Sequence, residues 1–287
     1  MLMAAAVFWG AHWVVARGIV AHVTPVGMSF WRWAIALLLL LPFAWAPLRR
    51  DRVKLAAAWK TILFFGCTGT VLYNTVGYYG LRQSTATNAL LFQSLTPGII
   101  PLFAFLLFRE RIGTLTALGL CVSFLGVLAI VFRLDAGALA ALRFDTGDLW
   151  LLGNVGLWAL YTACLRLAPR DVHPVSLFYA VMLAGMVTGL PAYALDAAAG
   201  GRVDWSGEVL IALLYLGAFP SVVCFLLWSK GVAAVGPAKA GSWLHVTPLA
   251  GIVMASLFLG ERVETHHAAG FTLILAGVWL ATRAKAA

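Results

Sequence analysis

The chain alternates between long apolar runs and short polar segments. Charged residues and clusters of glycine and proline divide it into ten runs in which most side chains are apolar. A helix of about 20 apolar residues is long enough to cross the hydrocarbon core of a bilayer. The pattern therefore predicts an all-α polytopic membrane protein with ten transmembrane helices. The expected helices are residues 3–21, 26–46, 59–81, 85–108, 113–132, 149–168, 174–195, 207–230, 236–259 and 266–282.

The composition agrees with a membrane location. Of the 287 residues, 62% are hydrophobic and 11% are charged, and the mean hydropathy is +0.93. A soluble protein has about 25% charged residues. The formal net charge of +9 comes mostly from basic residues between the apolar runs, where such residues orient a chain in the bilayer. We therefore expect membrane lipid around the protein and no nucleic acid bound to it.

The distribution of lysine and arginine predicts the orientation. Ten spans place both termini on one side of the membrane, and the loops and tail of that side contain thirteen basic residues. The other side contains five, or seven when Arg17 and Arg32, which lie inside the first two runs, are included. The positive-inside rule then makes both termini cytoplasmic. The first run has no basic segment before it and no cleavage pattern after it, so a retained helix is expected rather than a signal peptide.

One segment of the chain occurs twice. Residues 89–111 read ALLFQSLTPGIIPLFAFLLFRER, and residues 240–262 read AGSWLHVTPLAGIVMASLFLGER. In both copies a Thr-Pro pair stands 13 residues before a Glu-Arg pair. The separation of 151 residues also relates Gly66 to Gly217, and a separation of 149 relates Trp9 to Trp158.

These offsets predict two repeats of five helices, residues 1–135 and 146–287. Because five is odd, the second repeat would enter the membrane from the opposite face, and inverted repeats are typical of secondary transporters. Aquaporin-type channels use inverted repeats as well, and duplication can simply build a larger membrane protein. Both remain alternatives to a transporter.

The repeated motifs resemble those of a known family. Each fourth helix of a repeat ends in Glu-Arg (LFRERIG and LFLGERV), and a glycine-spaced helix follows it (ALGLCVSFLGVLAIV and AAGFTLILAGVWLA). Over essentially the whole chain this pattern resembles the EamA-type branch of the drug/metabolite transporter superfamily. The segments FWGAHWVVARGI and FWRWAIALLLLLP, with a tyrosine-rich third span, are similar to bacterial aromatic amino-acid exporters. The resemblance implies a multi-pass protein of the bacterial inner membrane that exports amino acids, other metabolites or drugs.

Polar and aromatic side chains in the middle of the spans are the candidates for substrate contacts. Polar groups are costly in hydrocarbon and therefore usually face the interior of a bundle. Several of these candidates share one helix face, such as Trp9, His12 and Trp13, or Asn154, Trp158 and Tyr161. A single polar side chain can instead bond a neighbouring helix, and a lysine near a span end can reach the interface. The predicted substrate-binding residues are Trp9, His12, Trp13, Tyr73, Asn74, Tyr78, Asn88, Gln93, Asn154, Trp158, Tyr161, Trp228, Lys239, Ser242, Trp243 and His245.

Three prolines are expected to act as hinges. Pro97, Pro220 and Pro248 lie inside apolar runs. A proline inside a helix removes one backbone donor, frees a carbonyl one turn earlier and bends the helix. Freed carbonyls are tolerated at membrane depth where protein or water satisfies them, so each proline is predicted to lie where cavity and hinge meet.

Several classes of function are excluded by what the spans lack. No intramembrane protease or metalloenzyme motif occurs, the four cysteines have no metal-ligand or disulfide spacing, and neither a metal nor a cofactor is predicted. All eleven Asp and Glu residues lie in loops or at span ends, so any proton coupling would require His12 or His245. Only Arg17, Arg32 and Lys239 could hold a phosphate, which favours a neutral or zwitterionic cargo.

The expected function is therefore secondary transport by alternating access. The predicted cargo is a small amphipathic metabolite, with aromatic or other bulky amino acids as first candidates. A broad drug or metabolite exporter and a channel-like facilitator are the alternatives. Small-residue patterns at Gly113/Ala117 and Gly277/Ala281 are compatible with a monomer or a weak homodimer.

Overall fold

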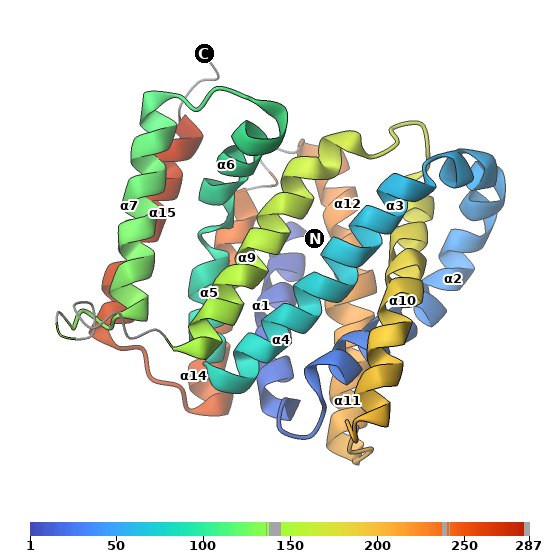
Figure 1. The fold of residues 1–287 in the computed structure, drawn as a ribbon, viewed down its shortest axis with the longest axis horizontal. Coiled ribbons are helices and arrows are strands. Elements are labelled where there is room, and N and C mark those ends of the chain that lie inside the picture. Colours follow the sequence, from blue (N-terminus) through green and yellow to red (C-terminus); the bar gives the residue numbers. More distant parts are fainter. Residues whose placement is uncertain (136, 138–144, 237–239, 241, 284–287) are drawn as a thin grey trace.

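The computed structural model describes residues 1–135, 137, 145–236, 240 and 242–283. Its elements in these ranges are helical, apart from an isolated antiparallel bridge between Val23 and Val203. The helices form one bundle in which α7 and α15 lie side by side at one end and α2 and α10 lie toward the other (Figure 1).

The first half of the chain contains helices that follow the predicted runs. The segments α3, η1 and α4 are continuous, and η1 is π-helical. In chain order the elements are α1 (Leu2–Ile19), α2 (Pro25–Ala57), α3 (Trp59–Phe65), η1 (Gly66–Leu72), α4 (Tyr73–Gln83), α5 (Ala86–Gln93), α6 (Thr96–Phe108) and α7 (Thr114–Val131).

The second half has a similar order of elements. The segments α11, η3 and α12 are continuous, and η3 is again π-helical. The elements are α9 (Thr146–Cys164), η2 (Leu165–Leu167), α10 (Pro174–Ala198), α11 (Gly207–Leu216), η3 (Gly217–Val223), α12 (Cys224–Val235), η4 (Ser242–His245), α14 (Val246–Leu259) and α15 (Thr265–Arg283).

Fewer helices pass a length-and-hydropathy test for membrane spans than the ten that the sequence predicts. In the described part of the chain five helices are long and apolar enough, and a sixth is counted if α5 and α6, which meet at an angle of 51°, form one span. The five are α1, α2, α7, α10 and the continuous helix from α11 to α12. α14 is one of the shorter apolar helices, and the segments from α3 to α4 carry many polar side chains.

The helices α2 and α10 begin in the same way. The hydroxyl of Thr24 accepts a hydrogen bond from the amide of Gly27, and Pro25 follows as the first helical residue. His173 caps α10 through its ring nitrogen, and Pro174 again starts the helix. Proline is suited to the first helical position because its missing N–H would have no partner there.

Glycines allow α7 and α15 to pack backbone to backbone. A Cβ added to Gly119 would lie 2.4 Å from the carbonyl oxygen of Gly277, and one added to Gly126 would lie 2.6 Å from that of Gly270. The order of these contacts makes the two helices antiparallel. At the 151-residue offset Gly119 corresponds to Gly270, and Gly126 corresponds to Gly277. The two contacts are therefore equivalent under exchange of the repeats.

Other helix contacts also occur in corresponding pairs. The helix α1 packs against α14 and α12, and its repeat counterpart α9 packs against α6 and α4. Likewise η1 contacts α10, and η3 contacts α2. The two π-helical segments differ in position by the same 151 residues as the repeat itself.

The carboxylate of Asp51 joins the end of α2 to the start of α10. It accepts hydrogen bonds from the amide of His173 (2.8 Å) and the hydroxyl of Ser176 (2.7 Å), and its side chain is almost fully buried. An anion at a helix N-terminus is also favoured by the helix dipole. Replacing Asp51 by alanine is therefore expected to lower the melting temperature of the purified protein by several degrees, measured by intrinsic fluorescence in detergent.

The matched control for this prediction is Asp171→Asn. Asp171 lies nearby and pairs with Lys54, but both side chains are at least half exposed, and exposed ion pairs contribute little to stability. Equal melting temperatures of Asp51→Ala and wild-type protein would show that the contact does not hold α2 to α10.

Candidate functional site

Among the described residues, a buried arginine forms the centre of the most extensive polar cluster. Arg32 lies in α2 and is only 5% exposed. Its partners come from α1, α4 and η3, so the cluster joins helices of both halves of the chain. We call the five residues Arg32, His12, Asn74, Tyr78 and Ser221 the arginine cluster; all of them are buried.

The guanidinium is held by neutral acceptors. Its Nη1 donates to the side-chain oxygen of Asn74 and lies 2.9 Å from Nε2 of His12 and 3.0 Å from the hydroxyl of Tyr78. Its Nε donates to the hydroxyl of Ser221 over 3.0 Å. The indole ring of Trp33 lies beneath the guanidinium, with 4.9 Å between Cζ and the ring centroid, a distance suited to cation–π attraction.

The network assigns a tautomer to a neutral His12 ring. A guanidinium can only donate, and Tyr78 places its hydroxyl 2.9 Å from the same ring nitrogen, Nε2. Nε2 therefore accepts, and the ring proton lies on Nδ1. His12 is a neutral acceptor next to a fixed positive charge, and a second proton on its ring would create repulsion with Arg32.

Pro220 and Ser221 show how η3 accommodates a proline. Pro220 has no amide proton, so it cannot donate to the carbonyl one turn earlier. The hydroxyl of Ser221 donates to the carbonyl of Leu216 over 2.9 Å. This bond satisfies the carbonyl inside the protein, and the same hydroxyl accepts from Arg32.

A second polar cluster connects α4, α5 and α9. The side-chain amide of Gln93 donates to the side-chain oxygen of Asn154 (2.7 Å) and to the hydroxyl of Tyr73 (3.2 Å). Asn154 in turn donates to the carbonyl of Tyr73 (2.5 Å). We call Tyr73, Gln93 and Asn154 the amide cluster. It adjoins the arginine cluster because Tyr73 and Asn74 are consecutive in α4.

Aromatic rings border the amide cluster. The ring of Trp158 packs against Tyr73, with 4.8 Å between centroids, and stacks on Tyr161 at 5.0 Å with an interplanar angle of 15°. A Cβ added to Gly69 would lie 2.5 Å from the Tyr161 ring, so glycine is needed for this close approach. Trp158, Tyr161 and Tyr73 are all partly exposed.

Trp9 and Trp228 form a further aromatic pair next to η3. Their ring centroids are 5.3 Å apart, and the indole N–H of Trp9 donates to the carbonyl of Pro220 over 3.0 Å. Trp13 is buried beside His12, with 5.0 Å between their ring centroids. The structure thus places Trp9, His12 and Trp13 of α1 against the same part of the bundle as the arginine cluster.

Several predicted site residues lie elsewhere. The amide of Asn88 donates to Ser84 and to the carboxylate of Asp148 (3.0 Å), at the end of α5 rather than in either cluster. Trp243 is 40% exposed and belongs to neither cluster. Lys239 and the side chains of Ser242 and His245 lie outside the described residues, and the prediction for them stays a prediction.

The prolines differ in their local settings. Pro97 stands in the first turn of α6, and the 51° bend lies just before it, between Gln93 and Thr96. The predicted fourth span is thus divided into α5 and α6 at a bend one turn before Pro97, and the role of Pro97 as a hinge stays a prediction. Pro248 lies in the first turn of α14 and follows η4, whereas Pro220 lies inside the continuous segment η3.

Arg32 and Ser221 are the members of the arginine cluster that are not among the predicted substrate-binding residues, and the sequence carried a signal for Arg32. The signal was an arginine inside an apolar run, between Trp31 and Trp33 and without an acidic residue near it in sequence. From the sequence, Arg32 is interpreted only as a basic residue near the outer end of its span that could hold a phosphate. The structure turns it inward instead.

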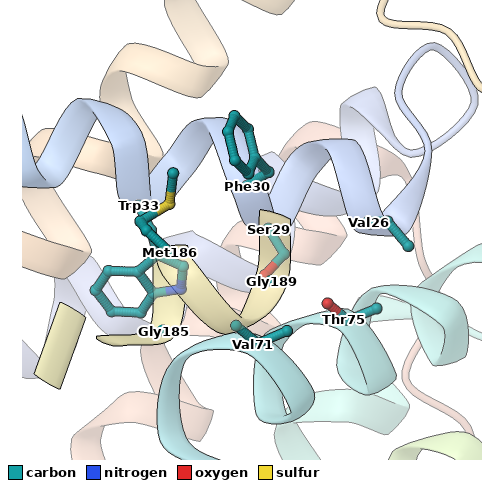
Figure 2. Close-up of a pocket in the computed structure, with 9 residues that line it drawn as sticks. All are labelled: Val26, Ser29, Phe30, Trp33, Val71, Thr75, Gly185, Met186 and Gly189. Carbon is teal, nitrogen blue, oxygen red and sulfur yellow. The ribbon is translucent and has the colours of Figure 1, made fainter. Parts of the chain in front are cut away.

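Two pockets lie outside these clusters. The first is a small hollow between α2, α10 and the η1–α4 segment, with room for little more than a water molecule. Figure 2 shows Val71 and Thr75 of the η1–α4 segment on one side of it and Ser29 and Trp33 of α2 on the other. The second, of about 530 Å³, is lined by residues 21–24, Arg82 and residues 200–204.

Comparison with known proteins places the chain in a family. The model of the EamA-like transporter family matches residues 1–132 and 145–283. The uncharacterized transporter YyaM of Bacillus subtilis is 24% identical over 286 residues, which cover 98% of this chain and 92% of YyaM. The uncharacterized inner membrane transporter YicL of Salmonella typhimurium is 26% identical and covers 97% of this chain and 93% of YicL.

A solved structure shares the fold. One protein crystal structure superposes with a TM-score of 0.64 at 19% identity and covers 97% of this chain and 94% of that one. The family model matches both halves of the chain, residues 1–132 and 145–283, and the shared fold likewise extends over nearly the whole chain. The protein belongs to the EamA-like transporter family of the drug/metabolite transporter superfamily, a family of multi-pass membrane transporters.

Proposed function

We propose that the protein is a secondary transporter that works by alternating access between two inverted five-helix repeats, residues 1–135 and 146–287. In this proposal ten spans cross the bacterial inner membrane and both termini are cytoplasmic. The observation that carries it is the correspondence of helix contacts at the repeat offset, because two related halves that pack alike can exchange conformations. The antiparallel contact of α7 with α15 also supports an inverted relation.

The solute is proposed to bind between the arginine cluster, the amide cluster and the rings that border them. Three observations support this location. The groups come from both halves of the chain, they lie near the middle of α1 and of the helix from α11 to α12, and they combine buried polar atoms with partly exposed rings. Polar groups at membrane depth commonly mark a substrate pathway.

The proposed cargo is a small amphipathic metabolite, with aromatic and other bulky amino acids as the first candidates. Rings such as Trp158 and Tyr161 can pack on an apolar or aromatic side chain. Amide and hydroxyl groups of the two clusters can bond the polar end of such a solute. In the cell the direction is proposed to be outward, and the protein is proposed to act as a monomer or weak homodimer in lipid.

A transport experiment tests this function. Purified protein in liposomes is expected to accelerate the exchange of labelled L-phenylalanine or L-tryptophan over protein-free liposomes, with and without a pH gradient. The gradient arm shows whether protons are coupled. If no member of a panel of amino acids and amphipathic metabolites moves faster than in protein-free liposomes, the proposal is wrong.

Trp158 provides a variant for the same assay. Trp158→Ala removes the ring that contacts Tyr73 and Tyr161 and is expected to reduce exchange of an aromatic solute about tenfold, the effect of losing about 1.4 kcal/mol of ring contact. Trp150→Ala is the control, since Trp150 lies in the same helix and stacks on Tyr79, and neither ring belongs to either cluster. Equal exchange rates for Trp158→Ala and Trp150→Ala would remove Trp158 from the site.

A further inference from the structure

Arg32 carries a positive charge that no carboxylate of the described residues balances. None of the ion pairs formed by the described residues includes Arg32. Its hydrogen-bond partners are a neutral imidazole, an amide and two hydroxyls. Throughout the sequence the acidic residues lie in loops or at span ends, so the chain itself supplies no partner of opposite charge at this depth.

Such a charge is costly to bury. Removing an ion from water is unfavourable even after the protein relaxes, and neutral hydrogen bonds and one aromatic ring offset only part of this cost. Buried charges in membrane spans are usually paired or serve a function. The Nη2 nitrogen of Arg32 makes no hydrogen bond to the described residues, so the guanidinium fork still has donor capacity.

The repeat shows that the fold does not require a cation at this place. At the 149-residue offset Arg32 corresponds to Val181. The structure supports this equivalence, because a Cβ added to Gly217 would contact the carbonyl of Arg32, and one added to Gly66 would contact the carbonyl of Val181. Two equivalent backbone positions thus hold an arginine in one half and a valine in the other.

We propose that Arg32 is the binding site for the carboxylate of the transported solute. This inference rests on the proposed transport function and adds the chemical class of the cargo, an amphipathic solute with a carboxylate. The planar guanidinium can bind a carboxylate through two parallel hydrogen bonds, one of them from Nη2. The carboxylate would take the place of Asn74 or His12 at Nη1, and Tyr78 could donate its hydroxyl to it.

The test uses four small molecules that separate the carboxylate from the rest of an aromatic amino acid. L-Phenylalanine and 3-phenylpropionate have the carboxylate, whereas L-phenylalaninamide and phenethylamine lack it. Each is added to purified protein in detergent, and the melting temperature is measured over a concentration series. A ligand of the folded state raises the melting temperature as its concentration exceeds its dissociation constant. Inorganic phosphate is a fifth probe.

The expected result is stabilisation by the two carboxylates alone. Arg32→Gln is expected to raise the concentration of L-phenylalanine needed for half-maximal stabilisation by about tenfold to a hundredfold, the range for loss of a charged hydrogen-bond partner. Arg49→Gln is the control, since Arg49 is an exposed arginine at the other end of the same helix. Arg32→Lys keeps the charge but lacks the fork and serves as a second variant if Arg32→Gln does not fold.

Equal stabilisation by L-phenylalaninamide and L-phenylalanine, equal stabilisation by phosphate, or an unchanged carboxylate preference in the Arg32 variants would overturn the inference. The liposome assay separates this outcome from failure of the proposed function. If exchange persists without a preference for carboxylates, the proposed transport function stands and the carboxylate site at Arg32 is wrong. If carboxylates stabilise the protein through Arg32 but no solute is exchanged, the carboxylate site stands and the proposed transport function is wrong.

Discussion

Asn74→Asp is expected to give a folded protein whose exchange of L-phenylalanine falls by about a hundredfold. Asn74 accepts a hydrogen bond from Nη1 of Arg32 and is 2% exposed. Aspartate has nearly the same shape, and its carboxylate would pair with the guanidinium and supply the charge that the cluster lacks. The pair would compete with a carboxylate of the solute, and about 2.7 kcal/mol of competition corresponds to the hundredfold loss.

The measurement compares exchange rates in liposomes with melting temperatures in detergent. The substitution is expected to lower the first and to leave the second about equal, because the new ion pair with Arg32 offsets the loss of the hydrogen bond that the Asn74 amide donates to the carbonyl of Thr70 over 2.8 Å. Gln83→Glu makes the same change of amide to carboxylate at the exposed end of the same helix and should alter neither. Full exchange activity in Asn74→Asp would contradict the role proposed for Arg32.

Gly66→Leu is expected to prevent accumulation of folded protein. A Cβ at this position would lie 2.5 Å from the amide nitrogen of Gly185 and 2.8 Å from the carbonyl oxygen of Val181. Both atoms belong to the backbone of α10, so a rotamer change cannot relieve the clash. Overpacking costs about 1–3 kcal/mol where side chains can adjust and more where they cannot. The measurement is the yield of monodisperse protein in detergent size-exclusion chromatography.

Gly153→Leu is the matched control. Gly153 lies inside α9, and an added Cβ would meet only a methyl group of Val76 at an ordinary 3.7 Å. Both variants make the same change within a helical segment, so any general effect of leucine on expression is shared. A normal yield of Gly66→Leu would show that η1 and α10 can separate without loss of the fold.

Much of the helical architecture follows from sequence periodicity alone. Apolar runs fixed where helices lie, because a backbone in hydrocarbon must satisfy its own hydrogen bonds. The 151-residue offset relates the glycines at which α7 and α15 meet, although their contact was not predicted, and the same offset separates η1 from η3. The π-helical geometry itself was not predictable, since it depends on how Gly66 and Gly217 approach neighbouring helices.

The site was predictable only in part, because contacts between distant segments decide it. His12, Asn74 and Tyr78 were selected as mid-span polar residues, and the structure brings them together around Arg32. Asn88 satisfied the same criterion but bonds Asp148, a residue 60 positions away. No local pattern distinguishes an asparagine that faces a buried guanidinium from one that faces an acidic residue at a helix end.

The Ser221 hydroxyl makes two hydrogen bonds, and this limits which substitutions could give a related protein a different solute preference. Its single proton satisfies the Leu216 carbonyl next to Pro220, and its oxygen accepts from Arg32. A substitution at this position would disturb both the backbone of η3 and the guanidinium. Asn74 likewise bonds both Arg32 and a backbone carbonyl, that of Thr70, whereas among the described residues the hydroxyl of Tyr78 in α4 bonds only the side chains of His12 and Arg32. Relatives that acquired a different solute preference would therefore be expected to vary first along α4 and to retain a hydroxyl in η3.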